Sequence, residues 1–145
     1  MSKLFNVASL LGFLFSINAS SALANPTVEA AGFVFKFQKC SVSKASAPLK
    51  CDFLVKNTGE RRSLSIYSTK SRAYDTGFND IAGNSASLGG REYKSTYTTE
   101  IPEETTLKGS ITFGKAPEGE LTSLDLGCYV TGKGSFKVKL PLSSQ

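Results

Sequence analysis

The chain has 145 residues, of which 17 are Lys or Arg, 12 are Asp or Glu and none is His, so its formal net charge is +5. The lack of imidazole excludes Ser-His-Asp and Cys-His catalysis and removes the commonest zinc ligand. The length suits one domain, and the chain lacks the interleaved basic and aromatic motifs of nucleic-acid-binding modules. We therefore expect neither an enzyme nor a nucleic-acid partner, and no cofactor.

The first 24 residues have the pattern of a secretory signal peptide. Lys3 gives a positive start, residues 4–17 are largely apolar, and Ala22 and Ala24 are small residues at the positions that a signal peptidase reads. The apolar run is shorter than the roughly 20 residues that span a bilayer. The sequence thus predicts cleavage after Ala24, a single mature domain over 25–145 without a membrane span, and an exported location, either periplasmic or secreted.

Alternating apolar residues predict short strands through the rest of the chain. Residues 57–60 and 131–134 have the composition of turns, and 91–99 is rich in the Tyr and Thr of half-exposed strands. The Gly- and Asn-rich stretch 75–90 is expected to be mostly loop. The residues predicted to face the core are Phe33, Phe35, Phe37, Leu49, Cys51, Phe53, Val55, Leu64, Ile66, Leu107, Ile111, Phe113, Leu124, Leu126, Cys128, Val130, Phe136, Val138 and Leu140. This pattern favours an all-β antiparallel sandwich of about seven or eight strands, with a small β-barrel as the alternative.

Three segments carry a family resemblance. Residues 51–59 (CDFLVKNTG) form a strand ending in an Asn-x-Gly turn, 75–79 (DTGFN) contain an Asp-x-Gly loop, and 104–113 (ETTLKGSITF) follow a turn that contains Pro102. Their order is similar to that of small exported bacterial immunoglobulin-like domains of largely uncharacterised function. The resemblance implies an immunoglobulin-like fold over most of residues 33–140, although the chain has no Trp. It implies little about activity, because such folds host unrelated functions.

Three cysteines lie in the predicted mature chain. An antiparallel hairpin that turns between Ala45 and Ser46 pairs residues whose numbers sum to 91, which places Cys40 opposite Cys51. Opposed positions suit disulfide geometry, so we predict a Cys40–Cys51 disulfide, with a sheet-to-sheet bridge through Cys128 as the alternative. On the first pairing Cys128 is a free thiol, which we expect to act as a small buried hydrophobe.

Candidate site residues are few. Tyr93 and Tyr97 fall on one face at strand spacing, with Tyr67 or Tyr74 nearby, and such an aromatic face can bind sugars or proteins. A second, weaker candidate is a calcium site. Asp75 and Asp80 flank a Gly/Asn loop, where their carboxylates would supply oxygen ligands.

The sequence predicts the general class of function but not a specific ligand or partner. We expect a non-enzymatic binding domain that contacts an envelope or surface protein through sheet edges and the loops at 75–90 and 100–104. One alternative is a small-ligand or glycan-binding module that uses the tyrosine face. Another is a weak hydrolase based either on Ser41 and Lys44, which match a Ser-x-x-Lys motif, or on the acidic turn at Glu103 and Glu104. The oligomeric state and the identity of the partner do not follow from the sequence.

Overall fold

The structure is a computed structural model that describes residues 26–42, 44, 47–93 and 95–142, without the side chains of residues 92 and 93. The predicted signal peptide lies outside these residues. Within them every regular element is a strand, and no helix is long and apolar enough to cross a membrane. The strands are β1 (Thr27–Ala30), β2 (Phe33–Val42), β3 (Leu49–Asn57), β4 (Arg62–Asp75), β5 (Asp80–Leu88), β6 (Arg91–Tyr93), β7 (Thr96–Ile101), β8 (Thr106–Phe113), β9 (Leu121–Val130) and β10 (Gly134–Pro141).

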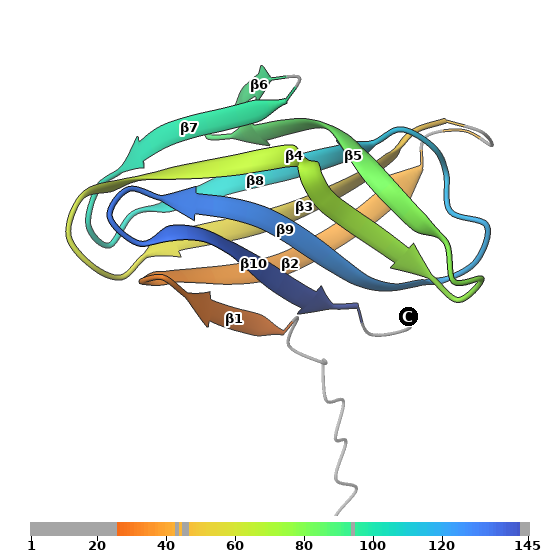
Figure 1. Ribbon diagram of the computed structural model, residues 1–145, viewed down its shortest axis with the longest axis horizontal. Helices are drawn as coiled ribbons and strands as arrows, with labels where there is room; N and C mark the ends of the chain where they lie inside the picture. The colour runs from red at the N-terminus through yellow and green to blue at the C-terminus, as the bar shows by residue number, and fades with distance from the viewer. Residues whose placement is uncertain (1–25, 43, 45–46, 94, 143–145) are drawn as a thin grey trace, which may run out of the picture.

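All strand pairs are antiparallel, and one hydrogen-bonded path runs β1-β2-β3-β8-β5-β4-β9-β10, with β6 attached to β5 and β7 attached to β4. The path folds over, so β9 and β10 cross in front of β2 and β3 (Figure 1). We call the layer of β1, β2, β3 and β8 the β3 wall, and the layer of β4, β7, β9 and β10 the β9 wall.

The two walls are joined on one side by β5. Residues 80–82 pair with β4 in the β9 wall, and from Gly83 onward β5 pairs with β8 in the β3 wall, with a register shift between Gly83 and Ser85. Gly83 is needed at this crossing, because a Cβ there would collide with the backbone carbonyl of Ser68.

On the other side β10 lies beside β1 and β2. There the contact is made by side chains, such as Phe35 and Phe136, whose ring centroids are 6.4 Å apart at a near-perpendicular angle. The result is a flattened, nearly closed barrel. The all-β antiparallel prediction is confirmed, and the continuous path fits the barrel alternative rather than two separate sheets.

The prediction that 75–90 is mostly loop is wrong. Only the turn from Thr76 to Asn79 separates β4 from the nine-residue strand β5. The bulge at Gly83 breaks the alternation of apolar residues, so that Ile81 faces the core before it and Ala86 and Leu88 face the core after it. The extra residue of a bulge shifts the apolar residues by one position, so the alternation with a period of two that indicates a strand is interrupted.

Both walls fill the interior with apolar side chains. The largest fully buried residues are Phe33, Phe35, Phe53, Phe113, Leu49, Leu64, Ile66, Ile81, Leu88, Ile101, Ile111 and Leu124. Alternation in β9 points Leu124, Leu126, Cys128 and Val130 inward. The intervening residues of β9 therefore face outward, and this arrangement positions the candidate site.

A buried polar cluster closes one end of the barrel. Asn57 is fully buried at the end of β3, where its Nδ2 donates to the carbonyls of Ile101 (2.8 Å) and Glu60 (2.8 Å). Its Oδ1 accepts hydrogen bonds from the backbone N–H of Gly59 (3.0 Å) and from Nε of Arg62 (3.3 Å). The one side chain thus ties together the ends of β3 and β7 and the start of β4.

Arg62 extends this cluster to the β1–β2 turn. Its guanidinium donates to the carbonyls of Ala31 (3.0 Å) and Gly32 (3.3 Å), and it lies 5.0 Å from the ring centroid of Phe33. The turn predicted at residues 57–60 therefore also carries the side chain that anchors this end of the barrel.

Candidate functional site

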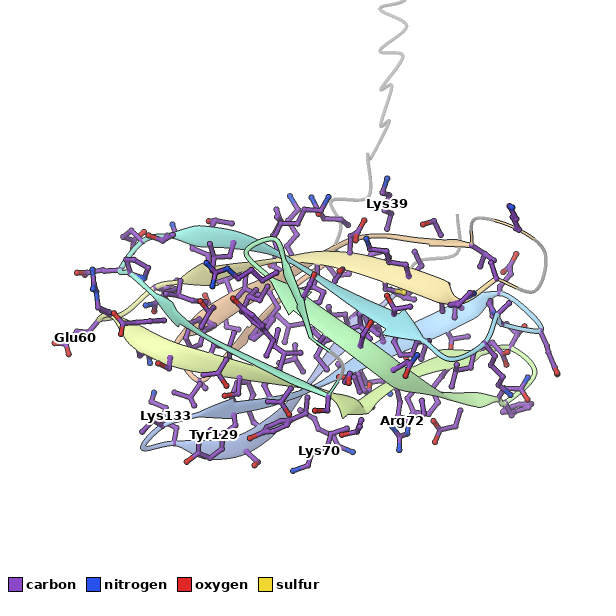
Figure 2. All side chains as sticks on the ribbon, turned by 90° about the horizontal axis from the view of Figure 1, so that it is seen from above. Lys39, Glu60, Lys70, Arg72, Tyr129 and Lys133 are labelled. Atoms are coloured by element: carbon purple, nitrogen blue, oxygen red, sulfur yellow. A yellow bond between two sulfur atoms is a disulfide. The ribbon has the colours of Figure 1, made fainter. Side chains whose placement is uncertain are left out.

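The outer surface of the β9 wall gathers cationic and aromatic side chains. On β10 the buried Val138 and Leu140 alternate with Lys137 and Lys139, whose side chains are exposed. Figure 2 shows Lys70, Arg72, Tyr129 and Lys133 on the same side of the molecule, opposite Lys39 of the β3 wall. We define the β9 face as Tyr67, Lys70, Arg72, Tyr74, Asp125, Tyr129, Lys137 and Lys139.

A bulge in β4 places Lys70 on this face. The ladder between β4 and β9 shifts between Tyr67 and Arg72, so the residues between them leave the regular register. Ser71 stabilises the bulge, because its Oγ donates to the carbonyl of Tyr67 (2.8 Å) and accepts from the backbone N–H of Gly127 (3.1 Å). A Cβ at Gly127 would press on Lys70, so glycine allows the bulge to lie close to β9.

The ammonium group of Lys70 then lies 4.7 Å from the ring centroid of Tyr67. This cation–π contact holds Lys70 over the wall. Arg72 is fixed differently, since its Nε is 3.1 Å from Oδ1 of Asp80 and its Nη1 donates to the carbonyls of Thr69 and Ser71.

The other cations of the face form no close ion pair with a described residue. In the part of the chain that the structure describes, the ion pairs are Lys56–Glu104, Arg61–Glu100 and Arg72–Asp80. Lys70, Lys137 and Lys139 belong to none of them. The β9 face therefore has three ammonium groups outside these ion pairs and one carboxylate, Asp125, which is opposite Lys139 in the β9–β10 ladder. The excess of positive charge favours an anionic ligand.

Three shallow hollows run across the β9 face. The largest, about 580 Å³, lies between Tyr74, Asp125, Lys139 and the β4–β5 turn. The second, about 370 Å³, shares Tyr74 with the first and is also lined by Lys70 and Lys137. The third, about 330 Å³, shares Lys70 and Lys137 with the second. Each hollow shares lining residues with the next, so the three adjoin one another along the face, an arrangement that suits an extended ligand better than a small enclosed one.

Tyr74 and Asp125 form the polar centre of the largest hollow. Burial raises the pKa of Tyr74, and the nearby negative charges of Asp125 and Asp80 raise it further. The phenol therefore stays protonated at neutral pH and can donate a hydrogen bond. Among the described residues no donor reaches the buried Oδ1 of Asp125, and a hydrogen bond to the Asp125 carboxylate is one of the causes that raise the pKa of Tyr74.

The structure brings some of the predicted tyrosines together and separates others. Tyr67 and Tyr74 share the β9 face, whereas Tyr97 is only 8% exposed and belongs to the core. Tyr93 lies on β6, and its side chain is outside the described residues. Tyr129 completes the face instead, and the alternation of Leu124, Leu126, Cys128 and Val130 was the signal that could have placed it outward.

Asp75 organises the β4–β5 turn and is almost fully buried. Its carboxylate accepts hydrogen bonds from the backbone N–H groups of Gly77, Asn79 and Glu118 and from Nδ2 of Asn79. These donors occupy the oxygens that a calcium ion would need. Asp80 is instead paired with Arg72, and the described residues contain no cluster of three metal-ligating side chains.

We expect Asp75→Asn to lower the urea midpoint of unfolding in a pH-dependent way. The pKa of Asp75 lies below its ordinary value, chiefly because the backbone N–H of Asn79 donates to the carboxylate. A folded-state pKa below the unfolded value stabilises the fold above about pH 4, and this stabilisation is lost as the pH falls through the folded pKa. The difference in midpoint between wild type and variant should therefore be largest above about pH 5 and shrink in more acidic buffer. An equal difference at all pH values would contradict this account, and Asp80→Asn is the matched control.

The cysteines behave as predicted. Cys40 and Cys51 are opposed in the β2–β3 ladder, with Cα atoms 4.0 Å apart, and form a disulfide. Cys128 is a free, buried cysteine, and burial raises the pKa of its thiol to about 12. The thiol is therefore protonated at neutral pH and packs as an apolar group.

The Ser-x-x-Lys pair lies at an exposed edge. Ser41 is near the end of β2 and Lys44 follows it in the turn, and both are exposed to solvent. Neither belongs to the β9 face.

Comparisons with protein-family models, with curated proteins and with solved structures found no match. The interpretation of the site therefore rests on its own geometry and charge.

Proposed function

We propose that the chain is a non-enzymatic exported binding domain whose β9 face binds an acidic glycan. The observation that supports this most is that Lys70, Lys137 and Lys139 line three adjoining hollows of the β9 face together with Tyr74. Tyr67 and Tyr129 lie on the same face beside these hollows, and the ammonium group of Lys70 contacts the ring of Tyr67. Aromatic rings pack against the apolar faces of sugar rings, and ammonium groups pair with their carboxylates or phosphates.

The disulfide supports the exported location, because such bonds persist mainly in oxidising compartments. The immunoglobulin-like relationship is part of the same proposal and rests on the three motifs at 51–59, 75–79 and 104–113.

The proposal is tested by retention of the purified protein on immobilised polyuronate, with neutral dextran as the reference matrix. The double variant Lys137→Ala/Lys139→Ala removes two charges from the β9 face and is expected to weaken binding about tenfold or more, because charge-assisted hydrogen bonds are lost. The variant Lys36→Ala/Lys39→Ala removes two charges from the β3 wall and should bind like wild type. Equal losses in both variants would mean that net charge alone is responsible, and no retention of wild type would refute the proposal.

Contact with an envelope protein is a second candidate, and Phe78 favours it. This ring is 99% exposed at the tip of the β4–β5 turn, with φ at 62°, a conformation that costs energy for a bulky residue. The hydrogen bonds to Asp75 fix the turn, so Phe78 is presented in advance of binding. Cross-linking in the envelope of the source cell tests this function. Capture of a defined protein by wild type, lost in Phe78→Ser, would move the assignment to protein binding.

A further inference from the structure

A second groove lies on the opposite side of the molecule, on the outer surface of the β3 wall. It has a volume of about 260 Å³ and is lined mainly by polar residues of β3, β8 and β5, namely Lys50, Asp52, Ser87, Lys108 and Ser110, together with Gly90 and Gly109. None of these residues belongs to the β9 face, so the inference drawn from it does not rest on the function proposed above.

Asp52 is the unusual member of this groove. Cys51 and Phe53 on either side are fully buried in the core, so alternation points Asp52 outward, yet its exposure is only 8%. Among the described residues no donor lies within hydrogen-bonding distance of its Oδ1, and Asp52 belongs to no ion pair. A buried acceptor without a donor is rare in folded proteins and costly, which indicates that a partner is supplied from outside the described chain.

Two hydroxyls continue the polar row from Asp52. In the ladders Asp52 is opposite Ser110 of β8, and Ser110 is opposite Ser87 of β5. The Oγ atoms of Ser87 and Ser110 are 2.7 Å apart and share one hydrogen bond, so each hydroxyl keeps further hydrogen-bonding capacity. Adjacent strands are about 4.8 Å apart, so the carboxylate and the two hydroxyls present a row of hydrogen-bonding groups at the spacing of a ligand with several hydroxyls.

The charges around the groove indicate which class of ligand it can bind. Lys50 and Lys108 are exposed at the rim of the groove and outnumber the single carboxylate. They would repel a cationic ligand and attract an anionic one. The unpartnered Oδ1 of Asp52, however, requires a hydrogen-bond donor. A ligand that meets both conditions carries hydroxyl groups and an anionic group together.

We propose that this groove binds an acidic monosaccharide, with a sugar hydroxyl donating to the carboxylate of Asp52, other hydroxyls bonding Ser87 and Ser110, and the sugar carboxylate paired with Lys50 or Lys108. The β9 face would instead hold an extended polymer, so the two sites differ in the size of ligand they suit.

The test is an amide NMR titration of the purified protein with D-glucuronate, glucose and acetate. Glucuronate has both hydroxyls and a carboxylate, whereas glucose lacks the charge and acetate lacks the hydroxyls. We expect glucuronate to shift the amides of residues 50–52, 87–90 and 108–110 saturably, with glucose and acetate binding at least about tenfold more weakly.

Two nearly isosteric variants test the assigned contacts. Asp52→Asn and Ser110→Ala should each weaken glucuronate binding about tenfold while the amide spectrum away from the groove stays unchanged, and Lys36→Ala, on the same wall outside the groove, should bind like wild type. The proposal is overturned if glucose or acetate matches glucuronate, if Asp52→Asn binds as wild type does, or if the shifts map only to the β9 face.

Discussion

Replacing Asn57 by alanine is expected to lower the free energy of unfolding by roughly 3–5 kcal/mol, the largest effect we predict for one substitution. Asn57 is fully buried and satisfies four groups: the carbonyls of Glu60 and Ile101, the N–H of Gly59 and Nε of Arg62. Alanine would leave the buried carbonyl of Ile101 without its donor and would remove the three part-buried bonds that hold Glu60, Gly59 and Arg62 against the end of β3. Urea denaturation followed by fluorescence or circular dichroism measures the change.

Two further variants give this prediction its controls. Asn57→Asp keeps the acceptor for Gly59 and Arg62 but sets a carboxylate oxygen against the carbonyls of Glu60 and Ile101, so it should be at least as destabilising as Asn57→Ala. Asn84→Ala removes an exposed side chain and should change stability by less than about 0.5 kcal/mol. If Asn57→Ala were as mild as Asn84→Ala, the buried cluster would not be what holds this end of the barrel together.

Removing the disulfide with Cys40→Ser plus Cys51→Ser is expected to cost about 2–3 kcal/mol, because a bridge across a separation of 11 residues restricts the unfolded chain. The loss should appear as a lower urea midpoint relative to the oxidised wild type. Reduced wild type should unfold near the midpoint of the double variant, since both lack the cross-link. A midpoint unchanged in both would show that the bridge contributes nothing to stability.

Local features of the fold were predictable, and the Cys40–Cys51 pairing is the clearest example. A short hairpin fixes its register from its turn, so the residue numbers alone place the two cysteines opposite each other. The register shift between Phe37 and Lys39 lies outside the stretch between the cysteines and leaves this sum intact. The alternation of β9 and β10 was likewise visible because both strands have one buried and one exposed side.

Features that depend on distant strands were not predictable. The sequence predicts a loop where β5 lies, because the bulge at Gly83, where the strand passes from one wall to the other, breaks the alternation of apolar residues. The inward orientation of Tyr97 was likewise not predictable from the sequence. Tyr and Thr both suit a strand, and only the position of β7 beside β4 decides that Tyr97 points into the core.

Some residues of the candidate site could be predicted from local sequence, and others are placed there only by the pairing of distant strands. Tyr67 and Tyr74 could be proposed from the sequence, but Lys70 joins them through a bulge, and Lys137 and Lys139 join them through the pairing of β4, β9 and β10. The burial of Asp52 on an outer surface also has no sequence signal, since Asp between Cys51 and Phe53 reads as an ordinary exposed strand residue.

The central claim, that the β9 face binds the ligand, is tested most directly by lysine acetylation footprinting with and without soluble polyuronate. Mass spectrometry would report the extent of acetylation of each lysine. We predict that polyuronate protects Lys70, Lys137 and Lys139 while Lys36 and Lys39 on the β3 wall stay as reactive as in the free protein. Protection of Lys36 and Lys39 to the same degree, or of no lysine at all, would contradict the account.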